Sequence, residues 1–208
     1  MSTSPFFYFK NFEFDAKALT EFVEAIPDTE WYGPFTWKEK INNLLKPEDR
    51  LPTFEVNNDI EVKWWMTISK FMDFTKCEEV NRIAKHFTVN NQPLFSGMAF
   101  KKTQKNYVQP FRPLMQNAAL DASLGIIRTF DIVIPIKGGF KESPVEALDT
   151  LTNTIYATEP TGKAYMLKTN PDWHYRWEET VEDFRYTLHL RGVMPHSYEN
   201  IKKLYDVQ

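Results

Sequence analysis

Residues 161–192, TGKAYMLKTNPDWHYRWEETVEDFRYTLHLRG, decide how the rest of the chain is interpreted. Two β-strands are predicted here: residues 164–168, which follow a Thr-Gly turn, and residues 184–191, in which apolar and polar side chains alternate. Successive side chains of a strand point to opposite faces, so the second strand has an apolar and a polar face. The apolar face is Phe184, Tyr186, Leu188 and Leu190, and the polar face is Arg185, Thr187, His189 and Arg191.

The polar face of residues 184–191 has two interpretations. It meets water if the sheet is covered on one side only. It lines the interior of a barrel if both sides are covered, and Arg185 then binds a carboxylate bidentately while the Thr187 hydroxyl adds a donor. A buried arginine favours an anionic ligand because an uncompensated buried charge is costly. We expect His189 and Arg191, further along the strand, to lie at the rim or in solvent.

One histidine, His174, lies shortly before this strand among three aromatic residues, Trp173, Tyr175 and Trp177. A histidine in such surroundings is either a packed, hydrogen-bonded residue or a metal ligand. His174 precedes Arg185 by a distance that fits the end of one strand, a turn and the start of the next, and this position favours a metal ligand. The three aromatic residues would then form the walls of a pocket.

Composition narrows the class of protein. The chain has 208 residues, 42% hydrophobic and 25% charged, which is typical of a globular domain. With a net charge of -3 and no basic stripe, we expect no nucleic-acid partner. The single cysteine, Cys77, excludes an internal disulfide and a cysteine-rich zinc site. No secretion signal and no membrane-spanning run is recognisable, so we expect a soluble, cytoplasmic protein without a membrane partner.

The first part of the chain predicts helices. Asp15 is a candidate N-cap, and apolar residues at positions i, i+3, i+4 and i+7 from residue 19 to residue 26 predict an amphipathic helix that Pro27 ends. A second apolar set of the same spacing runs from residue 80 to residue 87, with Thr75 and Glu78 as a capping box. These helices and the irregular segment between them form a predicted covering layer over residues 1–92.

After residue 92 the pattern changes to short strands separated by Gly, Pro and Asn turns. The predicted strands are residues 95–103, 126–136, 154–157, 164–168 and 184–191. Such spacing indicates an antiparallel sandwich or barrel rather than parallel units with crossover helices. The prediction is therefore one α+β domain over residues 1–208, with a β core at residues 93–192 and a C-terminal tail at residues 193–208.

The segment that carries His174 and the Arg185 strand resembles the C-terminal half of the Fe(II)- and 2-oxoglutarate-dependent oxygenases, especially the aspartyl/asparaginyl and prolyl hydroxylases. In that family a metal-binding histidine precedes an Arg-x-Ser/Thr pair that holds the distal carboxylate of 2-oxoglutarate. The resemblance implies that His174 binds Fe(II) and that Arg185 and Thr187 bind the cosubstrate. It also implies a double-stranded β-helix, or jelly-roll (cupin-like), core covered by the N-terminal helices.

The chain departs from the family at the first metal motif. The family has a His-x-Asp/Glu or a lone His there, but no histidine lies between His86 and His174. Asp121 stands near the matching position and is the candidate carboxylate ligand, although it could equally form a turn before the strand. Arg128 resembles a basic residue that contacts the cosubstrate in some members, although a surface arginine would explain it as well.

Three functions follow as hypotheses. The first is a non-haem Fe(II)/2-oxoglutarate-dependent hydroxylase that acts on an amino-acid-like or peptidyl substrate. The second is a catalytically degenerate relative that serves as a binding module, which the missing histidine favours. The third is a structural jelly roll of the kind found in phages and viruses. The substrate and the oligomeric state do not follow from the sequence.

Overall fold

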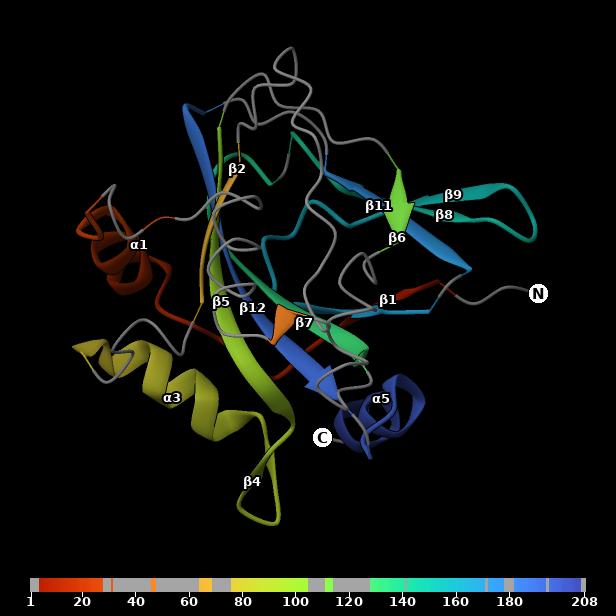
Figure 1. Ribbon diagram of the computed structural model, residues 1–208, viewed down its shortest axis with the longest axis horizontal. Coiled ribbons are helices and arrows are strands. Elements are labelled where there is room, and N and C mark those ends of the chain that lie inside the picture. Colours follow the sequence, from red (N-terminus) through yellow and green to blue (C-terminus); the bar gives the residue numbers. More distant parts are fainter. Residues whose placement is uncertain are drawn as a thin grey trace.

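The computed structural model describes residues 4–27, 31, 46–47, 64–68, 76–104, 111–113, 128–140, 142–170, 172–177, 182–193 and 195–206. Within these residues the chain is an α+β protein with mostly antiparallel sheets (Figure 1). The helices are α1 (Ala16–Glu24), α3 (Glu78–His86) and α5 (Tyr198–Asp206). The strands are β1 (Phe6–Tyr8), β2 (Trp64–Ile68), β3 (Thr88–Val89), β4 (Gln92–Pro93), β5 (Phe95–Gln104), β6 (Arg112–Pro113), β7 (Arg128–Lys137), β8 (Val145–Asp149), β9 (Thr154–Ala157), β10 (Tyr165–Lys168), β11 (Trp173–Trp177) and β12 (Phe184–Val193).

Two main sheets contain most of these strands. The six-stranded sheet has the order β1-β10-β7-β12-β5-β2, and the four-stranded sheet has the order β6-β11-β8-β9. A separate hairpin joins β3 to β4. Every described pair is antiparallel. From β5 to β12 the chain passes back and forth between the two main sheets, so most neighbours within a sheet are distant in sequence, the β8–β9 hairpin excepted.

The two faces of the six-stranded sheet support two different apolar cores. On one face, Leu188 and Leu190 of β12 join Ile132 of β7 and residues of α1 and α3 in the larger core. Phe22 of α1 lies against Phe100 of β5, with ring centroids 5.7 Å apart. Figure 1 shows α1 and α3 on the side of this sheet that faces away from the four-stranded sheet.

A second, smaller core lies between the two main sheets. Val133 of β7 and Leu167 of β10 meet Val145 of β8 and Tyr175 of β11 there. Both faces of β12 are buried, with Leu188 and Leu190 in the larger core and Arg185, Thr187 and His189 on the opposite face.

The sequence pattern predicted several elements correctly. Strand β9 has the predicted bounds, and β5, β7, β10 and β12 agree with the prediction to within two residues at each end. Helix α1 begins after Asp15, whose carboxylate accepts a hydrogen bond from the Ala18 amide at 2.9 Å, as an N-cap does.

Two expectations differ from the structure. The N-cap of α3 is Cys77, with no side-chain hydrogen bond, in place of the expected Thr75, which lies outside the described residues. The segment expected as a C-terminal tail contains α5, because Tyr198 and Ile201 are apolar at helical spacing and pack into the larger core. None of the described helices has the length and apolar character that a membrane span requires.

Candidate functional site

Strand β12 carries a row of buried polar side chains on the face toward the four-stranded sheet. Arg185 is 1% exposed, Thr187 is 2% exposed and His189 is 7% exposed. The interpretation in which this face meets water is therefore wrong, as is the placement of His189 at the rim. One physical reason is the segment after β7, which lies over Arg185 and which the sequence pattern did not place there.

Neighbouring strands add polar groups to the same interior. Lys101 and Thr103 of β5, Asp131 of β7 and Tyr165 of β10 are all buried. We call Lys101, Thr103, Asp131, Tyr165, Arg185, Thr187 and His189 the interior polar cluster. Buried polar groups cost free energy unless they are paired, so such a concentration marks the interior as a candidate binding site.

The turn after β7 holds Arg185 in position. The Nη2 atom of Arg185 donates to the carbonyl oxygen of Ser143 at 2.7 Å, and Nε makes a longer contact of 3.5 Å with the carbonyl oxygen of Gly138. The guanidinium carbon lies 5.3 Å from the ring centre of Phe140. These groups orient the guanidinium through carbonyl dipoles and a ring face, which carry no net charge.

Glycine is required at position 138. Its φ of +118° lies where side chains are strained, and a Cβ atom there would lie 2.5 Å from the Cα atom of Arg185. The missing side chain lets the turn approach β12 closely enough to contact the arginine.

Thr187, His189 and Asp131 form a buried hydrogen-bonded chain. The hydroxyl oxygen of Thr187 lies 3.0 Å from His189 Nε2, and His189 Nδ1 lies 2.9 Å from Asp131 Oδ2. The other carboxylate oxygen, Asp131 Oδ1, has no hydrogen-bond partner among the described residues. The chain therefore connects a hydroxyl group to a buried carboxylate through an imidazole.

Tyr165 contributes a buried hydroxyl group to the cluster. Its side chain is 4% exposed, and its hydroxyl group has no hydrogen-bond partner within the described part of the chain. Burial raises the pKa of Tyr165 well above its usual range, against a smaller lowering effect from the Arg185 charge. Tyr165 thus stays protonated and can donate a hydrogen bond to a ligand that enters between the sheets.

The residues expected around the metal lie on β11, and its alternation divides them. Trp173 and Tyr175 are buried in the core between the sheets, where the Tyr175 hydroxyl donates to the carbonyl oxygen of Lys168 at 2.6 Å. The side chain of Trp177 lies outside the described part of the chain.

His174 is half-buried and lies on the opposite face of β11, which it shares with Arg176. Arg176 in turn pairs with Glu146. The strand therefore turns His174 away from Arg185 and Thr187, which weighs against the metal-ligand assignment; that assignment stays a prediction.

Two further predicted site residues are not described in full. Asp121 lies outside the described residues, and of Arg128 only the backbone is described, at the start of β7 opposite Val193. Among the described residues, no three His, Cys, Asp or Glu side chains gather where they could hold a metal ion. The described residues therefore do not make up an iron site on their own.

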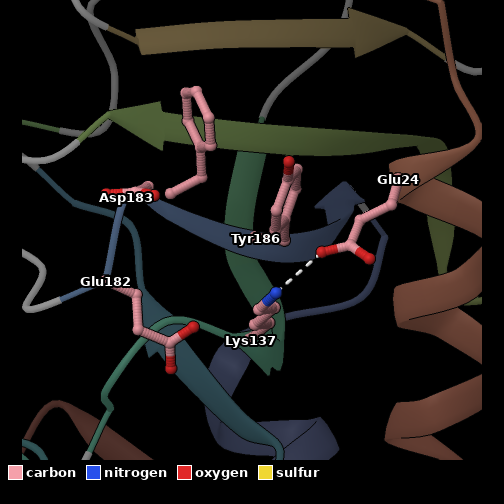
Figure 2. A pocket seen from close by; sticks show the side chains of 6 residues that line it. Glu24, Lys137, Glu182, Asp183 and Tyr186 are labelled. Carbon is pink, nitrogen blue, oxygen red and sulfur yellow. Dashed lines mark hydrogen bonds and ion pairs between the residues drawn. The ribbon is translucent and has the colours of Figure 1, made fainter.

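A cleft on the molecular surface lies beyond the other face of β12. It has a volume of about 430 Å³. Its lining residues are Glu24, Lys137, Glu182, Asp183, Phe184 and Tyr186 (Figure 2). Lys137 Nζ donates a hydrogen bond to Glu24 Oε1 at 2.7 Å in an ion pair, and this hydrogen bond raises the pKa of Lys137. Both partners are well exposed, so the pair contributes little to stability.

Three solved structures share a distant likeness with this chain. No protein-family model matches the chain, and no curated protein matches it.

Among solved structures, the chain is similar to a 2OG-Fe(II) oxygenase family oxidoreductase from Burkholderia pseudomallei (TM-score 0.40, 9% identity, 62% of this chain and 66% of that one). It is also similar to a prolyl-4-hydroxylase from Pseudomonas putida (TM-score 0.45, 11% identity, 86% and 98%). A third is a dioxygenase for auxin oxidation from Arabidopsis thaliana bound to 2-oxoglutarate (TM-score 0.40, 10% identity, 88% and 81%). At TM-scores below 0.5 these likenesses carry no weight of their own for the function.

Four of the seven residues of the interior polar cluster, Lys101, Thr103, Asp131 and Tyr165, were not singled out from the sequence pattern. A signal for Asp131 was present, since it is a lone charge inside the apolar run of residues 130–136. Nothing in the sequence distinguished Tyr165 from the apolar residues beside it, because its hydroxyl group acquires meaning only from the strands that surround it.

Proposed function

We propose that this protein binds 2-oxoglutarate, or a closely similar small dicarboxylate, between its two main sheets. Arg185 and Thr187 hold one carboxylate, and Tyr165 donates a further hydrogen bond. The observation that carries the proposal is the burial of Arg185 together with the buried Tyr165 hydroxyl group, which has no partner among the described residues. A guanidinium group and two hydroxyl groups are donors suited to a carboxylate.

The strand order supports a double-stranded β-helix as the architecture of this site. The chain alternates between a six-stranded and a four-stranded antiparallel sheet from β5 to β12, and β12 occupies a central position. The resemblance stated above implies the same architecture, with the Arg-x-Thr pair on the last strand. On this proposal, residues 1–208 form a single domain.

The reaction we propose is the oxidation of an amino-acid-like or peptidyl substrate by an Fe(II)/2-oxoglutarate oxygenase. Bound Fe(II) would supply the oxygen chemistry in such an enzyme. The described residues alone do not fit the metal, because no three ligating side chains converge among them. The proposed roles of the described residues are therefore to bind and orient the dicarboxylate.

A second candidate function is a degenerate relative that binds a dicarboxylate without catalysing a reaction. The orientation of His174 on the outward face of β11 favours it. The two candidates differ in one observable, since only the oxygenase converts 2-oxoglutarate to succinate when Fe(II) and O₂ are supplied.

The binding proposal is tested by thermal unfolding with and without 2-oxoglutarate, in the presence and absence of Mn(II). A ligand at 100 times its dissociation constant adds about 2.7 kcal/mol to the free energy of unfolding. We expect Arg185→Met to weaken binding roughly 10- to 100-fold, because hydrogen bonds to charged groups contribute about 1.5–3 kcal/mol.

Two further variants sharpen this test. Thr187→Val removes one hydroxyl group and should weaken binding less than Arg185→Met does. Arg176→Gln removes an arginine from the outward face of β11 and should bind as the wild type does. Wild-type protein that 2-oxoglutarate fails to stabilise under any of these conditions would contradict the proposed function.

A further inference from the structure

We infer that carboxylate binding in the interior polar cluster takes up one proton, at the His189–Asp131 pair. The inference rests on the proposed function and adds to it a coupling between ligand affinity and pH. It follows from the direction of hydrogen bonds in the buried chain Thr187–His189–Asp131.

The neutral imidazole blocks the donor function of Thr187. The Asp131 carboxylate can only accept, so His189 Nδ1 carries the hydrogen that bridges the 2.9 Å contact. His189 Nε2 is then an acceptor, and the hydroxyl group of Thr187 must donate to it across 3.0 Å. In this state Thr187 presents only lone pairs to a ligand carboxylate, which is itself an acceptor.

One proton added to the His189–Asp131 pair reverses the direction of the hydrogen bond between His189 and Thr187. With Nε2 protonated, the imidazole donates to the hydroxyl oxygen of Thr187. The hydroxyl hydrogen is then available to a ligand, and Thr187 can donate to a carboxylate beside Arg185. The proton also adds a positive charge next to the incoming anion, so protonation and anion binding favour each other.

The surroundings contain charges of both signs. The titratable and charged groups on the strands around His189 are Asp131 on β7, Lys101 on β5, Arg185 and Arg191 on β12, Tyr165 on β10 and Tyr175 on β11 of the facing sheet. Among these groups the Asp131 carboxylate is an anion, and Lys101, Arg185 and Arg191 are cations. A dicarboxylate shifts this balance toward protonation because it adds negative charge to the same interior.

The alternative assignment of the proton leads to the same result. If the proton resides on Asp131, His189 Nδ1 accepts it and Nε2–H donates to Thr187. The number of protons taken up is one in both cases, and so is the direction of the Thr187 hydroxyl group. Proton uptake is therefore a property of the His189–Asp131 pair, whichever of the two members carries the proton.

The experiment is calorimetric titration of the full chain with 2-oxoglutarate in two buffers of different ionisation enthalpy, at pH values between about 5.5 and 8.5, where histidines usually titrate. The difference in heat between the buffers gives the number of protons taken up. We expect close to one proton per ligand at the alkaline end. There the dissociation constant should rise about tenfold for each pH unit.

Three variants separate this coupling from a structural effect. His189→Gln places a permanent amide donor beside Thr187, so it should bind with an affinity that does not change with pH and without proton uptake. Thr187→Val retains the His189–Asp131 pair but lacks the hydroxyl group, so proton uptake should fall. His196→Gln removes a histidine outside the cluster and should leave the uptake unchanged.

The outcomes distinguish the two proposals. Binding that takes up no proton anywhere in this pH range would overturn the coupling and leave the proposed function intact. The coupling would also be overturned if His189→Gln took up as many protons as the wild type. Absence of 2-oxoglutarate binding at every pH would overturn the proposed function, and the coupling with it.

Discussion

Single residues in the turn after β7 hold the Arg185 guanidinium in a fixed orientation inside the protein. Gly138 has a φ of +118°, and its lack of a side chain lets the turn approach Arg185. The carbonyl oxygens of Gly138 and Ser143 then fix the guanidinium. Because this orientation exists before a ligand arrives, binding does not have to immobilise the arginine side chain.

Tyr165 gives a prediction in which stability and binding move in opposite directions. Its buried hydroxyl group lacks a partner among the described residues, so Tyr165→Phe should leave the free energy of unfolding unchanged or raise it, by up to roughly 2 kcal/mol. The same variant should bind 2-oxoglutarate more weakly, because one donor is lost. Denaturant unfolding and calorimetric titration measure the two effects, with Tyr156→Phe, outside the cluster, as the control. A variant that is less stable and binds normally would show that Tyr165 is a structural residue.

Sequence patterns identified some of these residues and missed others for a physical reason. Arg185 and Thr187 could be predicted because a polar face on an alternating strand is visible in the sequence. The role of His189 was predicted wrongly, and Tyr165 was not singled out, because their burial depends on segments distant in the sequence, which for Tyr165 include the second sheet. That sheet forms from strands that are distant in sequence, such as β8 and β11.

At the scale of elements, β11 shows how strand phase decides a side chain's role. Its sequence WHYRW alternates aromatic residues with His174 and Arg176. Trp173 and Tyr175 bury large apolar surfaces between the sheets, so His174 and Arg176 must face outward. The alternation was visible in the sequence, but the spacing between His174 and Arg185 does not reveal which face of the strand is buried.

The helices are joined by a polar contact whose strength depends on pH. Glu79 of α3 accepts hydrogen bonds from Arg82 Nε at 2.7 Å and from the Asp15 amide, before α1, at 2.8 Å. The Arg82 hydrogen bond is the main reason that the pKa of Glu79 is lowered. A lowered pKa in the folded state means that Glu79 stabilises the fold above the usual pKa of glutamate. This contribution is lost as the pH falls through the lowered value.

Glu79→Gln should therefore lower the melting temperature near neutral pH and have a progressively smaller effect in acid. Thermal unfolding over a series of pH values measures the difference between the two proteins. Glu21→Gln, which alters an exposed pair with Lys17, is the matched control and should have little effect at any pH. A Glu79→Gln effect that is constant with pH would mean that shape, and not charge, accounts for the contact.

At the scale of the whole molecule, covering both faces of one sheet produces the site. Helices α1 and α3 cover the first face of the six-stranded sheet, and the four-stranded sheet packs against β1, β10 and β7 on the second (Figure 1). A sheet covered on one side would expose the polar face of β12 to water, where Arg185 would attract an anion only weakly. The sequence predicted the class of fold from its short strands, but the pairing of β12 with both β5 and β7 is long-range and has no local signal.

The most direct test of the central claim is a crystal structure of the protein with 2-oxoglutarate and Mn(II). We expect a carboxylate of the ligand between the two main sheets, within hydrogen-bonding distance of the Arg185 guanidinium and of the Thr187 and Tyr165 hydroxyl groups. A ligand found only on the surface, for example in the cleft beside Lys137, with the interior polar cluster closed and unchanged, would contradict the claim.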